Sequence, residues 1–330
     1  MDPLRKVCLG KTGLEVTRLG MGGAPLGGLY KDVPEETAVA TVERALALGV
    51  RFFDTAPLYG HGKSELRMGR VLASQNRNSF VLSTKVGRLF TEEDPGKVES
   101  PWFENPPPLM PYFDFSYDGV MRSYEESRKR LKLDRIDILY IHDPDDHFEQ
   151  AMRGAYRALD ELRGAGDVRA IGAGMNQAEM LVQFAREAGW DCFLLAGRYT
   201  LIDHSGLKEL LPLCVRKGIS IVIGGPYNSG ILATGARPGA KFDYHEPSPE
   251  LFEKVRHIEE ICGRYSVPLK AAALQFPLAH PAVAAIIPGA RSAAEVDENF
   301  RLVGFPIPQE FWAELRNQKL LPEDAPTPGE

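Results

Sequence analysis

The sequence predicts an α/β fold, a single (β/α)8 barrel. Eight short apolar segments alternate with amphipathic stretches along the 330 residues. Val, Ile, Leu and Phe occupy odd and even positions of the segments alike, so both faces of each expected strand are apolar, which is typical of parallel strands covered on both faces. The rival fold is an open doubly wound sheet. The barrel is favoured because the glycines of "GMGGAPLGG" lack the G-x-G-x-x-G spacing of that sheet's dinucleotide-binding form.

The elements follow in a regular order. Residues 5–16 predict a β-hairpin, turning at Lys11–Gly13, that plugs the N-terminal end of the barrel. Two long loops, 87–115 and 226–247, follow the third and seventh strands and should lie at the C-terminal face, where barrel sites form. Residues 1–330 are expected to form one domain, with 321–330 a disordered, Pro-rich tail. The barrel strands are predicted at 18–23, 51–55, 80–85, 136–142, 168–174, 192–198, 219–225 and 283–289.

The composition argues against several classes of partner. A net charge of −6 and a pI near 5.8 offer no basic surface for nucleic acid or an anionic membrane. No apolar run approaches the roughly 20 residues that span a bilayer, and the N-terminus resembles no signal peptide, so a cytoplasmic location is expected. We expect a small-molecule substrate and a monomer or homo-oligomer. Four scattered cysteines are expected to be free, buried thiols: Cys8, Cys192, Cys214 and Cys262.

Polar residues end three consecutive apolar strands. Asp54, Lys85 and His142 hold these positions, and Tyr59 follows Asp54 by five residues. A buried lysine needs a carboxylate partner, and Asp54 on the adjacent strand is placed to supply it. We expect Lys85 to lower the pKa of the Tyr59 hydroxyl, and His142 to bind a substrate oxygen. Such a group suits proton transfer at an oxygen while another species moves hydride.

Plainer interpretations stand beside this one. A strand-end Asp–Lys pair is often structural, and His142 with "DPDDH" could simply begin a polar loop. His61 and Lys63 are expected to be solvated, and Glu65 to lie in the first turn of the next helix. The convergence of three strand ends favours a site.

A metal-dependent hydrolase is an alternative from another class of chemistry. Its ligands would gather from several strand ends, whereas the acids and histidines here cluster in one loop, so no metal is expected. The candidate ligands are His142, Asp143, Asp145, Asp146 and His147.

Four motifs resemble the aldo-keto reductase family. They are "GVRFFDTAPLYGHGKSELRMGRVL", "LSTKVG", "RLKLDRIDILYIHDPD" and "IIPGARSAAEVDENF", and the resemblance runs from about Lys6 to Arg301. It implies a catalytic tetrad of Asp54, Tyr59, Lys85 and His142, with Tyr59 as general acid in carbonyl reduction and general base in alcohol oxidation. It also implies a nicotinamide cofactor bound across the barrel mouth without a Rossmann fold.

The resemblance implies a set of cofactor contacts. Departures from the family pattern occur at Met175, Ala196 and Gly224, where a Ser, a Gln and an aromatic residue are common. The implied contacts are Gly22, Gly23, Asp54, Asn176, Gly225, Pro226, Gly230, Leu232, Pro288, Gly289, Arg291, Glu295 and Asn299.

The choice between NAD and NADP leans modestly to NAD. Glu295 stands where NADP-preferring relatives tend to place an Arg, and a carboxylate repels a 2′-phosphate. Ser292 and Glu295 also form a capping box, which explains Glu295 without a ligand. Arg291 could still bind a 2′-phosphate.

Within the family the chain resembles the aldose 1-dehydrogenase group, which includes L-fucose dehydrogenase and the similar pyridoxal 4-dehydrogenase. This implies oxidation of a cyclic hemiacetal at C1 to a lactone, with NAD(P)+ taking the hydride. Tyr30, Trp102 and Arg198 are the candidate substrate contacts, and Phe103 or Tyr112 could replace Trp102. The alternatives are a general aldehyde or ketone reductase and a non-catalytic cofactor-binding subunit.

Overall fold

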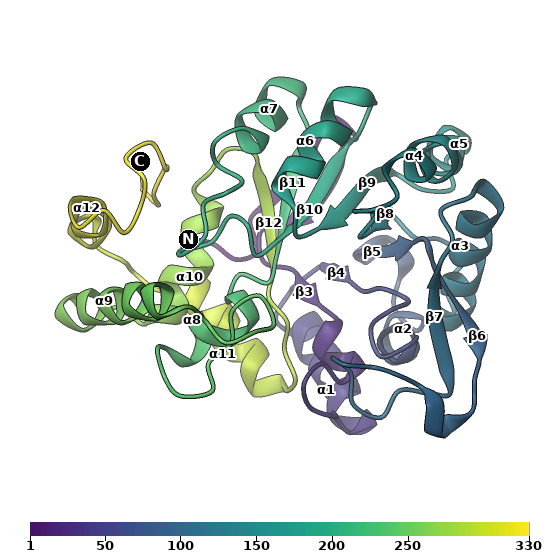
Figure 1. Cartoon of the computed structure of the whole chain (residues 1–330), viewed down its shortest axis with the longest axis horizontal. Helices are drawn as coiled ribbons and strands as arrows, with labels where there is room; N and C mark the ends of the chain where they lie inside the picture. Colours follow the sequence, from purple (N-terminus) through teal and green to yellow (C-terminus); the bar gives the residue numbers. More distant parts are fainter. Residues whose placement is uncertain (330) are drawn as a thin grey trace.

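The barrel strands form one closed parallel sheet. The computed structural model describes residues 1–329 (Figure 1). Bridges from Leu19 to Ile286 and from Gly22 to Gly289 join the first barrel strand to the last, so the sheet closes and the predicted (β/α)8 barrel is confirmed. In order around the sheet, the strands are β3 (Met21–Gly22), β4 (Phe52–Asp54), β5 (Val81–Val86), β8 (Ile138–His142), β9 (Ala170–Met175), β10 (Cys192–Ala196), β11 (Ser220–Gly224) and β12 (Val283–Ile287).

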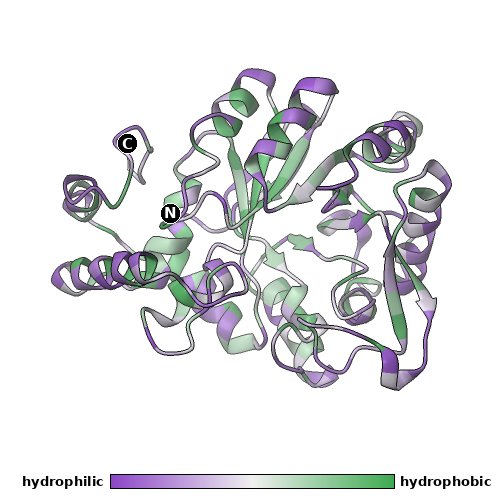
Figure 2. Cartoon of the chain, in the orientation of Figure 1, coloured by the Kyte–Doolittle hydropathy of each residue, from purple (hydrophilic) through white to green (hydrophobic). Residues whose placement is uncertain are grey.

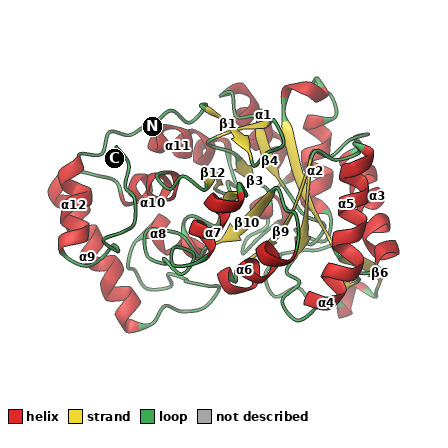
Figure 3. Cartoon of the chain, turned by 90° about the horizontal axis from the view of Figure 1, so that it is seen from above, coloured by secondary structure: helices red, strands yellow, loops and turns green. Residues whose placement is uncertain are grey.

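Helices follow the strands and surround them (Figure 3). Serine side chains cap three of them: Ser116, Ser248 and Ser292 each accept a hydrogen bond from a first-turn N–H. The α-helices are α1 (Glu35–Ala47), α2 (Lys63–Leu72), α3 (Tyr117–Leu131), α4 (Phe148–Gln150), α5 (Arg157–Ala165), α6 (Ala178–Glu187), α7 (Leu210–Lys217), α8 (Ile231–Thr234), α9 (Pro249–Tyr265), α10 (Leu269–Leu278), α11 (Ala293–Val303) and α12 (Gln309–Asn317). The 3-10 helices are η1 (Ala24–Gly27), η2 (Arg77–Ser79), η3 (Pro95–Lys97) and η5 (Asn228–Gly230), and η4 (Ala151–Tyr156) is a π-helix. No helix within residues 1–329 is both long and apolar enough to cross a bilayer.

The predicted N-terminal hairpin is present and plugs the barrel. Strands β1 (Lys6–Leu9) and β2 (Leu14–Thr17) pair antiparallel. Leu9, Leu14 and Val16 are buried and pack with inward-facing strand residues such as Phe52 and Ile138. The strands are apolar, whereas the outer helices carry hydrophilic residues (Figure 2). One core therefore fills the barrel and a second lies between the strands and the helices.

The loop at 87–115 is more ordered than expected. It contains an antiparallel pair, β6 (Arg88–Glu92) and β7 (Leu109–Phe113), which projects beside α3 (Figure 1). Three aromatic residues, Phe90, Tyr112 and Phe113, stand in these strands, and residues of this type favour the extended conformation. The loop at 226–247 contains η5 and α8.

The C-terminal tail also differs from the expectation of disorder. Leu321, Ala325 and Thr327 are buried, and Arg316 of α12 donates a hydrogen bond to the Ala325 carbonyl at 2.7 Å. The tail therefore packs through its few apolar residues, although its overall composition is polar. Residue 330 lies outside the described residues.

Three predictions about single side chains are wrong. His61 is buried, with Nδ1 2.8 Å from the Leu109 carbonyl oxygen. Lys63 bonds the Glu104 carbonyl at 2.9 Å instead of facing solvent. Cys8 is exposed, although the four cysteines are free and the other three are buried.

Glu65 lies in the first turn of α2, as predicted, but its side chain is fully buried. It accepts hydrogen bonds from Thr84 at 2.7 Å and from Arg130 at 2.6 Å. This ion pair fastens α2, which follows the Tyr59 loop, to α3.

Replacement of Arg130 by Met should lower the free energy of unfolding by about 3 kcal/mol, because it leaves the Glu65 carboxylate buried without its cation. Urea unfolding measures the loss. Arg153→Met is the control: its ion pair with Glu149 is exposed and its removal should cost less than about 0.5 kcal/mol. Equal losses in the two variants would contradict this role.

Candidate active site

Strand alternation aims three of the predicted residues into the barrel. Phe52 and Tyr140 belong to the core inside the barrel, and side chains two residues apart on a strand share a face. Asp54 and His142 therefore point inward at the carboxyl ends of β4 and β8. Lys85 lies between them on β5, its position paired with Tyr140.

A buried ion pair joins two of these residues. Lys85 Nζ lies 2.8 Å from Asp54 Oδ2, and both side chains are only 2% exposed. The ammonium also donates to the Thr55 carbonyl at 2.8 Å, and Ser83 donates to the other carboxylate oxygen at 2.7 Å. Hydrogen bonds thus compensate for part of the cost of burying two charges.

The loop after β4 brings Tyr59 to this pair. Lys85 Nζ lies 4.6 Å from the centroid of the Tyr59 ring. The loop packs backbone against backbone on η1: a Cβ at Gly60, whose φ is +63°, would lie 2.1 Å from the Gly27 carbonyl oxygen. Glycine at position 60 is therefore required for the close approach that places Tyr59.

The pKa of Tyr59 differs from the prediction. Burial raises it above the ordinary value, and the nearby Lys85 ammonium offsets only part of that rise. Burial by itself would lower the pKa of Lys85, yet Asp54 and Tyr59 hold it above its usual range. The phenol thus keeps its proton at neutral pH beside a charged lysine.

His142 completes the group. Its ring stands edge-on to Tyr59, with centroids 5.9 Å apart. Burial, together with the cations Arg88 and Lys85, holds its pKa well below the ordinary value, so the imidazole is neutral. Its Nε2 lies 3.5 Å from Asp143 Oδ2, which Arg88 contacts at 2.9 Å. A neutral imidazole has one N–H to donate and is suited to orienting an oxygen.

These four residues line a cavity of about 580 Å³ at the carboxyl ends of the strands. The cavity opens there because Gly174, Ala196 and Gly224 leave the adjoining wall without bulky side chains. Met175 also lines it. The departures at Ala196 and Gly224 thus enlarge the space.

Most predicted cofactor contacts line the same cavity. Leu232 and Pro288 do not: Leu232 is fully buried and Pro288 borders a separate small cavity. The lining residues from the predicted set are Gly22, Gly23, Asp54, Asn176, Gly225, Pro226, Gly230, Gly289, Arg291, Glu295 and Asn299.

The start of α11 forms one end of the cavity. Ser292 Oγ accepts from the Glu295 N–H at 3.3 Å, while Glu295 Oε2 accepts from the Arg291 N–H at 2.8 Å. In the predicted capping box, the bond back from Glu295 therefore goes to the N–H of Arg291, one residue before the N-cap Ser292. Arg291 makes no ion pair within residues 1–329, and its buried Nε has no hydrogen-bond partner there.

The three candidate substrate residues also line the cavity. Tyr30 and Trp102 each pack a ring against Tyr244, with centroids 6.3 Å and 5.9 Å away. Tyr244 lies in the loop at 226–247, and sequence reasoning did not single it out. Lys270 and Glu298 were missed as well: Lys270 stands in no recognisable motif, and Glu298 lies in the motif "IIPGARSAAEVDENF" but was assigned no role.

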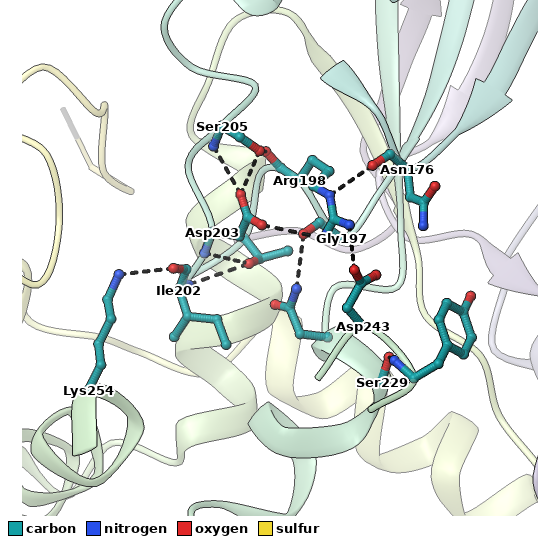
Figure 4. A network of polar contacts seen from close by, with 12 residues as sticks. Asn176, Gly197, Arg198, Ile202, Asp203, Ser205, Ser229, Asp243 and Lys254 are labelled. Atoms are coloured by element: carbon teal, nitrogen blue, oxygen red, sulfur yellow. Dashed lines mark hydrogen bonds and ion pairs between the residues drawn. The ribbon is translucent and has the colours of Figure 1, made fainter. Parts of the chain in front are cut away.

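The guanidinium of Arg198 bonds other residues of the chain. It donates to the Asn176 carbonyl and to Asp243 Oδ2, both at 2.8 Å, and lies 3.4 Å from Asp203 (Figure 4). Ser229 Oγ accepts from the Tyr244 N–H at 3.0 Å in the same network. Arg198 thus ties the loop that carries Tyr244 to the end of β9.

A trypsin site at Lys241 reports on this loop, since the bond after Arg237 precedes Pro238 and resists trypsin. Arg198→Met should raise the rate of cleavage there about tenfold, because charge-assisted bonds to Asp243 are lost. Mass spectrometry of timed digests measures it. Arg256→Met, which removes exposed ion pairs on α9, is the control. The same acceleration in both variants would show that the Arg198 contacts do not hold this loop.

Within residues 1–329, no group of three or more His, Cys, Asp or Glu side chains is arranged to hold a metal ion. The acids and histidines after β8 belong to one loop and include the exposed Asp146.

Known proteins share the sequence and the fold. A model of the Aldo/keto reductase family matches residues 18–319. Pyridoxal 4-dehydrogenase of Microbacterium luteolum is 42% identical, over 96% of this chain and 98% of its own. D-threo-aldose 1-dehydrogenase of a Pseudomonas species is 38% identical, over 94% and 96%.

Among solved structures, the holo form of aldo-keto reductase AKR11C1 from Bacillus halodurans shares the fold, with a TM-score of 0.76, 24% identity and 97% of each chain covered. The family match covers most of the chain, and two relatives exceed 30% identity over nearly its whole length. The chain is therefore an oxidoreductase that belongs to the aldo/keto reductase family, whose members use nicotinamide cofactors.

Proposed function

We propose that the chain oxidises the anomeric carbon of an aldose of the L-fucose or D-threo type to the lactone, with NAD(P)+ as oxidant. The observation that carries the proposal is the buried Lys85–Asp54 pair beside Tyr59 in a cavity. The relatives named for D-threo-aldose and pyridoxal support the substrate class. Aldoses and pyridoxal are both aldehydes that close into cyclic hemiacetals.

Each residue of the tetrad has a distinct task in this reaction. Bound nicotinamide supplies the hydride acceptor. The C1–H bond breaks with its electron pair, the C1–O bond gains double-bond character, and ionised Tyr59 takes the hydroxyl proton. Lys85 stabilises the phenolate by its charge, and Asp54 keeps that charge compensated. Neutral His142 donates a hydrogen bond to the substrate oxygen.

The cavity fits a dinucleotide at its far end. Arg291 is a cation without an ion pair beside the first turn of α11, where backbone N–H groups and the helix dipole favour phosphate. Asn176, which also lines the cavity, would hold the carboxamide. Glu295 adds negative charge at the same end, so the preference leans to NAD, with NADP as the alternative.

Tyr59→Phe should lower the turnover number at least a hundredfold while the affinity for the cofactor stays the same, because only the proton acceptor is lost. Reduction of NAD with a panel of aldoses and pyridoxal gives the rates, and quenching of tryptophan fluorescence gives the affinity. Full turnover by the variant would refute the assignment.

The pH dependence follows from the pKa of Tyr59. Burial holds it above the ordinary value, so the phenolate needed for oxidation becomes more abundant as pH rises. The oxidation rate should therefore climb through the alkaline range, and carbonyl reduction should fall there. Rate profiles in both directions measure this, and an oxidation optimum at neutral pH would contradict it.

Glu295→Gln removes a charge but keeps an oxygen to accept the Arg291 N–H. The affinity for NADP relative to NAD should rise about fivefold at low salt, since the repulsion of a 2′-phosphate is lost. Glu310→Gln, an exposed acid in the first turn of α12, is the control. An unchanged ratio would limit Glu295 to its structural role.

Three other functions are distinguished when simple aldehydes and ketones are added to this panel. Turnover of pyridoxal alone would identify a pyridoxal 4-dehydrogenase, in line with the relative at 42% identity. Reduction of simple aldehydes or ketones without oxidation of aldoses would identify a general reductase. Cofactor binding without any turnover would identify a non-catalytic subunit.

A further inference from the structure

The cations that line the cavity are almost all paired with carboxylates. Of five such side chains, four make ion pairs and the fifth, Arg291, makes none within residues 1–329. A paired cation has little affinity left for a further anion, since its partner already compensates its charge. The pairs are Lys85–Asp54 at 2.8 Å, Arg88–Asp143 at 2.9 Å, Arg198–Asp243 at 2.8 Å and Lys270–Glu298 at 2.8 Å.

Two carboxylates on the wall have no such partner within residues 1–329. Glu295 lies at the start of α11, where it accepts the Arg291 N–H at 2.8 Å, and Asp145 lies near the tetrad. Asp145 lines the cavity three residues after His142 and makes no ion pair within the described chain. Burial and the neighbouring Asp143 raise its pKa, and the charge of Arg88, which is already paired with Asp143, offsets only a small part of that rise. Lys241 does not compensate it from the cavity: Lys241 is exposed, lies 4.7 Å from the Tyr30 ring and is not part of the lining.

The two ends of the cavity therefore differ in charge. At the start of α11 the unpaired acid, Glu295, stands near the unpaired cation, Arg291, whereas Asp145 stands after His142 with no unpaired cation in the lining near it. An anionic group on a substrate at the tetrad meets no free cation and faces Asp145. Within walls of low dielectric that repulsion is strong.

Aromatic rings offer a neutral surface at the rim. Tyr244 packs between Tyr30 and Trp102, and all three line the cavity. Rings of this kind bury the apolar face of a small cyclic molecule without needing charge on it.

We propose that Asp145 is a specificity-determining residue that restricts this enzyme to uncharged ring substrates and rejects sugars bearing a carboxylate or a phosphate. The inference rests on the proposed function in one respect: it takes the tetrad as the place where the substrate reacts. Its physical basis is repulsion between the unpaired Asp145 carboxylate and an anionic substrate, and repulsive contacts of this kind often provide specificity.

The test compares an aldose with the uronic acid of the same ring configuration, at mildly alkaline pH where aspartate is ionised. For the wild type, kcat/KM should be at least about tenfold lower for the uronic acid. Asp145→Asn should close most of this gap, mainly by raising the value for the uronic acid, and added salt should narrow the gap in the wild type.

Asp146→Asn is the matched control, because Asp146 is the adjacent acid, is exposed and does not line the cavity. It should leave the ratio unchanged. Equal kcat/KM for the two sugars in the wild type, or the same shift in both variants, would overturn the proposal.

A second pair of substrates separates this inference from the proposed function. If no aldose is oxidised, the proposed function fails, and the charge preference is measured instead by reduction of carboxybenzaldehyde and its neutral carboxamide analogue. Faster reduction of the carboxamide, with the difference lost in Asp145→Asn, supports the role of Asp145. Equal rates refute it.

Discussion

The ion pair between Lys85 and Asp54 is the interaction on which the site depends. Burying either charge alone would cost several kcal/mol, so the two strand ends must meet in the register that brings the ammonium within 2.8 Å of the carboxylate. The pairing of Asp54 with Ser83 sets that register, and Ser83 also bonds the carboxylate. Tyr59 and His142 then approach a charge whose position is already determined.

The shape of the cavity follows from the residues that are small. Gly174, Ala196 and Gly224 leave space where larger side chains would fill the barrel mouth, and loops from distant parts of the chain enclose it. Arg198 connects three of these segments, so one side chain holds the loop that carries Tyr244. Three of the candidate catalytic groups lie on strands, whereas Tyr59 and the rim belong to loops.

Much of the fold and of the central site could be predicted from local pattern. The alternation of apolar segments predicted the barrel, and polar residues at strand ends indicated Asp54, Lys85 and His142. The β6–β7 pair, the packed tail and the Glu65–Arg130 contact were not predicted. Each depends on partners chosen by packing: Arg130 meets Glu65 across 65 positions of sequence, and Asp243 meets Arg198 across 45.

The sequence by itself determined which residue types stand at which strand ends, because a parallel strand covered on both faces has little room for charged residues except near its end. Only the tertiary structure decided their electrostatic state. Burial outweighs the Lys85 ammonium at Tyr59 and raises the pKa that the sequence led us to expect lowered. That balance depends on solvent exclusion by the whole barrel, which no short stretch of sequence contains.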